Sequence, residues 1–66
     1  MGGAVHTFQT TDPRLVERCE ADLRSGHQTT VLVPMGFANY PVTGVIADVV
    51  KSKHGSRYLS EISIRT

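Results

Sequence analysis

The stretch TDPRLVERCEADLRSGHQTTVLV, residues 11–33, decides the fold because it joins one helix to one strand. Asp12 and Pro13 are typical of a helix start: an aspartate accepts hydrogen bonds from free backbone N–H groups, and proline lacks only an N–H that the first turn leaves unused. Gly26 is typical of a helix end. The apolar residues between them recur at helical spacing, at Leu15, Val16, Cys19 and Leu23. The pattern predicts an amphipathic helix of about three to four turns.

Around this helix, β-forming residues dominate the chain. Four runs are expected to be strands: residues 4–9, 28–33, 42–51 and 57–65. Residues 35–41 contain glycine and asparagine and are flanked by prolines, so they predict a loop. Residues 52–56 predict the loop of a hairpin, with Gly55 as the natural position for a positive φ.

The register of this hairpin bears on assembly. Pairing Val50 with Tyr58 places Ile46 opposite Ile62 and leaves both faces of the hairpin substantially apolar. An exposed antiparallel hairpin would not tolerate two apolar faces, so the second face is expected to meet a helix, a barrel interior or another subunit. A β-bulge near Asp48 is the alternative, because it would turn one strand over and remove the need for a second buried face.

The length and composition restrict the possible classes of protein. A chain of 66 residues with one cysteine is expected to form one domain, residues 1–66, with residues 1–3 disordered. Most stand-alone enzymes are excluded by this size, and no internal disulfide can stabilise the core. We therefore expect a homo-oligomer, most simply a dimer. The start of the chain has no secretory signal, and no apolar run is long enough to span a membrane, so a cytoplasmic protein without membrane contact is expected.

Two short motifs resemble strands of small barrels. The helix is followed by VLVPMG at residues 31–36 and GVI at residues 44–46, an order similar to the Sm-like RNA-binding fold. The sequence GVIADVV at residues 44–50 is similar to a strand of KOW and other SH3-like domains. The resemblance implies a small barrel and a ring-forming oligomer, and it transfers no binding residue. The fold expected overall is α+β, with the helix packed on a small antiparallel sheet of about three to five strands, or an SH3-like or Sm-like barrel.

No pattern of residues indicates catalysis. Cys19 lies in the apolar helical stripe and is expected in the core, and the chain lacks the paired cysteine or histidine spacing of a metal site. There is no Gly-X-Ser-X-Gly elbow and no phosphate-binding loop. We expect no catalytic residue, no cofactor and no metal.

Two segments are candidates for binding. Phe37 and Tyr40 form an aromatic loop that is suited to anchoring a protein partner or stacking on bases, or else to closing one end of the core. The second segment is a basic hairpin tip comprising Lys51, Lys53, His54 and Arg57. Such a tip is suited to contacting phosphates, or else to discouraging aggregation at a strand edge.

These features predict a small non-enzymatic binding or regulatory module that acts as a homo-oligomer through the aromatic loop and the basic tip. One alternative is a small-barrel protein that binds nucleic acid, in particular RNA. Another is a small-ligand or enzymatic site shared between protomers. The residues available for that shared site are His6, His27 or His54 with Tyr58 or Asp48. The expected partners of the protein are further copies of this chain, another protein, or nucleic acid.

Overall fold

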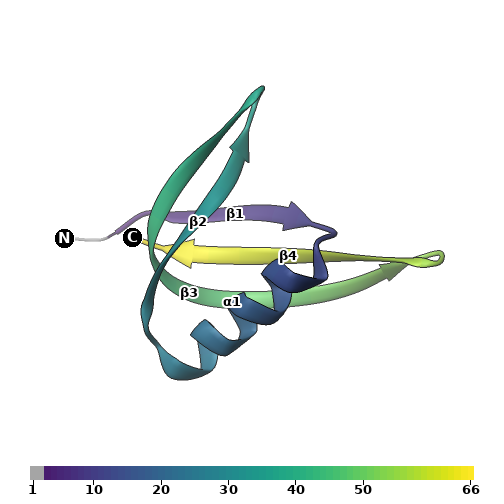
Figure 1. Cartoon of the computed structure of the whole chain (residues 1–66), viewed down its shortest axis with the longest axis horizontal. Coiled ribbons are helices and arrows are strands. Elements are labelled where there is room, and N and C mark those ends of the chain that lie inside the picture. The colour runs from purple at the N-terminus through teal and green to yellow at the C-terminus, as the bar shows by residue number, and fades with distance from the viewer. Residues whose placement is uncertain (1–2) are drawn as a thin grey trace.

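The computed structural model describes residues 3–66 and contains one helix and four strands (Figure 1). In chain order they are β1 (Val5–Thr10), α1 (Pro13–Ser25), β2 (Gln28–Met35), β3 (Ala38–His54) and β4 (Arg57–Arg65). This confirms the predicted α+β class with a β-α-β-β-β order. Of the three N-terminal residues expected to be disordered, the first two lie outside the described residues.

The four strands form one antiparallel sheet in the order β1-β4-β3-β2. The long strand β3 belongs to both hairpins: its first half pairs with β2 and its second half with β4. The sheet curls into a half-barrel that stays open, since β1 and β2 are its edges. The helix packs on one face, mainly against β3, and we call this face the core side and the opposite face the outer side.

The helix begins and ends where the sequence predicts. The Asp12 side chain accepts a hydrogen bond of 3.0 Å from the Arg14 N–H, and Pro13 occupies the first turn. Gly26 ends the helix, so local capping chemistry sets both boundaries. Val16 and Cys19 are buried against the sheet, which confirms Cys19 as a core residue.

The core lies between the helix and the core side of the sheet. Its buried residues are Phe8, Val16, Cys19, Val31, Val33, Ile46, Ile62 and Ile64. Burying each of the larger side chains stabilises the fold by about 1.5–3 kcal/mol. Every element therefore contributes to one small cluster, and no second core exists among residues 3–66.

Both hairpins are closed by two-residue turns, which corrects the two loops predicted for residues 35–41 and 52–56. Gly36 and Gly55 are the first residues of these turns and have φ angles of 62° and 65°. The second residue of each turn has a negative φ, so both have the glycine-first pattern of type II′ turns. The strands consequently continue through residues that the sequence assigned to loops.

The short turn also changes the hairpin register. Val50 lies opposite Glu61, and Tyr58 lies opposite Lys53, so the predicted pairing of Val50 with Tyr58 is wrong. The reason is that a two-residue turn fixes the pairing of every following residue, whereas the prediction assumed a longer loop.

A β-bulge interrupts β3 between Ile46 and Asp48, as the alternative interpretation predicted. It brings Val49 to the core side, where it packs against the buried cluster. Val50 faces the outer side and is 46% exposed. The apolar residues of this hairpin therefore do not require a second subunit to cover them.

No helix within residues 3–66 is both long enough and apolar enough to cross a membrane.

Candidate binding surfaces

The two predicted binding segments lie on different projections of the molecule. The tip of the β2–β3 hairpin and the tip of the β3–β4 hairpin extend in different directions from the helix-covered centre (Figure 1). We call residues 31–42 of the first hairpin the apolar arm and residues 51–59 of the second the basic arm. Phe37 and Tyr40 belong to the apolar arm, and the predicted basic residues belong to the other. The two sets do not form a single site within one chain.

On the core side of the apolar arm, apolar side chains continue past the buried core and are exposed to solvent. Val33 is buried on the core side of β2, and its cross-strand partner is Tyr40. Tyr40 and Met35 lie on the same side of the hairpin and are 52% and 47% exposed. The arm therefore presents an apolar face beyond the point where the core covers it.

The tip and the outer side of the arm are also apolar. Phe37 is fully exposed in the turn, and Leu32 is exposed on the outer side opposite Pro41. The sequence has no charged residue between His27 and Asp48. Contacts made by this arm must therefore depend on apolar burial and on backbone hydrogen bonds, and they will be insensitive to salt.

On the basic arm, the charges are partly engaged within the chain. The Nζ of Lys51 lies 3.1 Å from a Glu20 carboxylate oxygen on the helix. The Nζ of Lys53 lies 5.9 Å from the centre of the Tyr58 ring. Within residues 3–66 no carboxylate forms an ion pair with Lys53, His54 or Arg57. The uncompensated positive charge is therefore confined to the end of the arm, where His54 and Arg57 are cross-strand partners.

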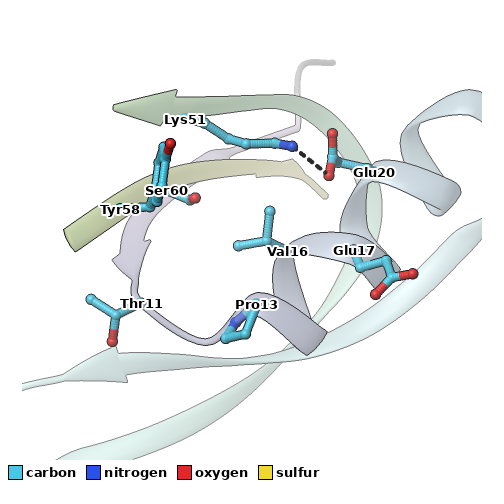
Figure 2. Close-up of a pocket in the computed structure, with 8 residues that line it drawn as sticks. All are labelled: Thr11, Pro13, Val16, Glu17, Glu20, Lys51, Tyr58 and Ser60. Carbon is cyan, nitrogen blue, oxygen red and sulfur yellow. Dashed lines mark ion pairs between the residues drawn. The ribbon is translucent and has the colours of Figure 1, made fainter. Parts of the chain in front are cut away.

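A groove of about 540 Å³ separates the basic arm from the first half of α1. Its lining comprises Thr11, Pro13, Val16, Glu17, Glu20, Lys51, Tyr58 and Ser60 (Figure 2). The Lys51–Glu20 ion pair bridges the helix and the arm. Sequence reasoning missed this groove because its two walls are more than thirty residues apart in the chain and meet only in the observed register.

The buried Cys19 thiol is not activated as a nucleophile, and the described residues form no metal-binding cluster. Burial raises the pKa of the Cys19 thiol, the Asp22 carboxylate raises it further, and the Arg18 guanidinium opposes them. The thiolate is thus disfavoured. No group of three or more histidine, cysteine, aspartate or glutamate side chains within residues 3–66 is placed to hold a metal ion.

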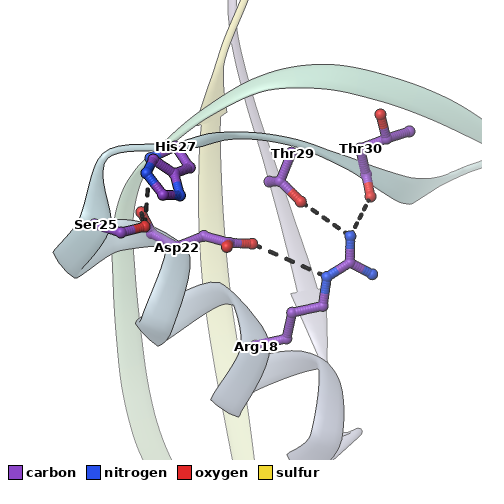
Figure 3. A network of polar contacts seen from close by, with 6 residues as sticks. All are labelled: Arg18, Asp22, Ser25, His27, Thr29 and Thr30. Carbon is purple, nitrogen blue, oxygen red and sulfur yellow. Dashed lines mark hydrogen bonds and ion pairs between the residues drawn. The ribbon is translucent and has the colours of Figure 1, made fainter.

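Arg18 ties the helix to the open edge of β2 (Figure 3). Its guanidinium donates to the Thr29 hydroxyl at 2.9 Å and to the Thr30 carbonyl at 3.0 Å. The contact with Asp22 is longer, at 3.9 Å, and acts as a loose ion pair. One consequence is that the Thr30 carbonyl is occupied and is not free to pair with another strand.

Comparison of the chain with protein-family models, with curated proteins and with solved structures found no match. The function must therefore be argued from the surfaces themselves.

Proposed function

We propose that this chain is a non-enzymatic binding module that acts as a homo-oligomer and captures a protein partner with its apolar arm. One observation carries the proposal: Phe37 stands fully exposed at the tip of an uncharged hairpin whose apolar row continues from the core. A side chain placed there adds nothing to the core of its own chain. An apolar pocket on a partner would give it the burial that it lacks.

The geometry of the arm limits the entropic cost of binding at Phe37. Burial of a phenylalanine side chain stabilises a complex by about 1.5–3 kcal/mol. The strands paired on either side of the two-residue turn hold the backbone at Phe37 in place, so little backbone freedom remains to be lost on binding. Met35 and Tyr40 flank the tip on one side and Leu32 on the other, which supports a pocket that encloses the arm.

Photo-crosslinking tests the proposal directly. A photoreactive amino acid placed at Phe37 should crosslink one defined protein in extracts of the source cells, at low and at high salt. The same amino acid at Tyr58, an exposed aromatic position on the basic arm, serves as the control and should not capture that protein. Phe37→Ala should abolish co-purification of the crosslinked protein, while Tyr58→Ala should retain it. Equal capture from both positions, or undiminished co-purification by Phe37→Ala, would show that the apolar arm is not the anchor.

The basic arm supports a second candidate function, binding of nucleic acid. The supporting observation is that Lys53 and Arg57 lack a carboxylate partner within the described chain, and that the Lys53 Nζ lies over the Tyr58 ring. A cation next to an aromatic face suits a single-stranded backbone with one stacked base. Lys53→Ala and Arg57→Ala should then each reduce the salt dependence of RNA binding by about one charge. Unchanged mobility of RNA and DNA at low salt would exclude this candidate.

A further inference from the structure

We propose that two copies of this chain associate through their β1 strands, which pair antiparallel about a two-fold axis at Thr7 and join two four-stranded sheets into one continuous sheet. The inference names the interface of the homo-oligomer proposed above and rests on that part of the proposal, but not on the apolar arm. It follows from where the unpaired backbone groups of the sheet lie.

The backbone of β1 offers one free row of hydrogen-bonding groups. The Thr66 N–H donates to the Ala4 carbonyl at 2.8 Å, which makes this pair a hydrogen-bonded one. Bonded and non-bonded pairs alternate along an antiparallel ladder, so His6, Phe8 and Thr10 direct their N–H and C=O groups to β4. The N–H and C=O groups of the intervening residues, Val5, Thr7 and Gln9, point away from the sheet.

Counting from the turn between β3 and β4 leads independently to the same assignment of bonded and non-bonded pairs. His54 and Arg57 flank a two-residue turn and must be a hydrogen-bonded pair. Counting along β4 from Arg57, alternate residues bond β3, and Ser63 is among them. Ser63 lies opposite Thr7, so this pair is not hydrogen-bonded through the backbone, and the Thr7 backbone faces outward.

The open edge of β2 is protected against pairing. The same alternation, counted from the Met35–Ala38 pair, turns the backbone of Thr30, Leu32 and Pro34 outward. Pro34 has no N–H to donate, and the Thr30 carbonyl already accepts a hydrogen bond from Arg18. A second strand could therefore form only an interrupted set of backbone hydrogen bonds with the β2 edge.

The unpaired stretches of β3 are protected as well, whereas β1 is not. In the apolar arm, Pro41 removes an outward N–H, and in the basic arm the outward-facing positions of β3 are occupied by the lysines Lys51 and Lys53. Proline and lysine are the residues by which natural proteins prevent edge pairing. The sequence of β1, VHTFQT, contains no proline, lysine, arginine or carboxylate. Among the described residues, β1 is therefore the edge that is left able to pair.

The β1 edge is complementary to a second copy of itself. With Thr7 at the axis, it faces the partner's Thr7, while Val5 faces the partner's Gln9 and Gln9 the partner's Val5. All of these are outward-facing positions, so each pair can exchange two N–H···O bonds. No like charges meet across the axis, because Val5 and Gln9 are uncharged and their neighbours on β4 are Arg65 and Glu61, of opposite sign. In a closed two-fold dimer both β1 edges are paired with each other, so neither remains free to bind a further copy.

Sedimentation of three proteins tests the inference: the full chain, Thr7→Pro and Thr7→Val. The full chain should be a dimer that dissociates on dilution. Thr7→Pro removes the outward N–H from both copies and should weaken dimerisation at least about 100-fold, or about tenfold for each lost hydrogen bond. Thr7→Val is the matched control, since it removes the same hydroxyl contact with Ser63 but keeps the N–H, and it should remain dimeric.

A crosslinking variant guards against the possibility that Thr7→Pro fails to fold. In a Cys19→Ala background, Thr7→Cys should form a disulfide-linked dimer on mild oxidation, since Cα atoms of a bonded antiparallel pair lie about 5.5 Å apart. Leu32→Cys, on the protected β2 edge, should stay monomeric. A full chain that is monomeric at every concentration would overturn both this interface and the proposed homo-oligomer. A dimer that persists in Thr7→Pro and does not crosslink at position 7 would overturn the interface alone.

Discussion

Ile62 should be the side chain on which the stability of this small core depends most. It is completely buried, and in the sheet it lies between Phe8 on β1 and Val49 on β3. Ile62→Ala removes three buried carbons, which is about 2.4 kcal/mol at about 0.8 kcal/mol each. The cavity that remains raises the cost to about 3–4 kcal/mol. A single core of this size supplies only about 3–5 kcal/mol in total, so the variant should be largely unfolded at 25 °C.

Urea unfolding followed by far-ultraviolet circular dichroism measures this effect, with all proteins at one concentration because association adds to apparent stability. Ile62→Val should remain folded and lose about 1 kcal/mol, which lowers Tm by about 4–8 °C. Val50→Ala is the control on the neighbouring strand: its side chain is 46% exposed on the outer side, so the loss should stay within about 0.5 kcal/mol. If the free energy of unfolding of Ile62→Ala differed from that of the unmodified chain by less than about 0.5 kcal/mol, the placement of β4 at the centre of the core would be refuted.

Three further predictions concern the thiol, two glycines and the helix cap. The pKa of Cys19 is raised by burial, so the fold has its full stability at pH values below the ordinary thiol range and loses it as the pH rises through the raised value. Alkaline urea titrations should therefore show a steeper decline for the natural chain than for Cys19→Ala, and equal slopes would contradict this. Gly44→Ala should destabilise more than Gly55→Ala, because a Cβ on Gly44 would collide with the Arg65 carbonyl, whereas at Gly55 only the positive φ opposes alanine, by about 1–2 kcal/mol. Thermal melts compare the two, and a reversed order would be inconsistent with the close approach at Gly44. Asp12→Ala should lower stability by about 1 kcal/mol and Asp12→Asn much less, and identical losses would show that the side chain does not cap the helix.

The helix could be predicted from the sequence almost to the residue because its boundaries are set locally. Asp12 and Pro13 start it and Gly26 ends it through contacts within a few residues. The strands were harder to predict because their extent depends on pairing. Residues 38–41 and 52–54 are poor strand formers by composition, yet each extends a hairpin whose backbone hydrogen bonds are made with the opposite strand.

The candidate surfaces were only partly predictable for the same reason. The sequence indicates Phe37 and Tyr40 as binding candidates because aromatic side chains in a loop can anchor a partner or stack on bases, and both lie exposed. That they and the basic residues occupy separate arms follows from the length of strand β3, which the predicted loops shortened at both ends. The free edge of β1 could not be found from the sequence at all, because the direction of each N–H depends on the register with β4.

The pairing of β1 with β4 brings together residues 62 positions apart, since Thr66 contacts Ala4. Each hairpin, in contrast, closes through a turn of adjacent residues, an event that takes about 1–10 μs. We therefore expect β1 to be the last strand to dock during folding and the first to leave when the native chain fluctuates. In the proposed dimer, this late-forming strand is held from both sides. Amide hydrogen exchange in β1 should then slow as protein concentration rises, while exchange in the centre of β3 should not change.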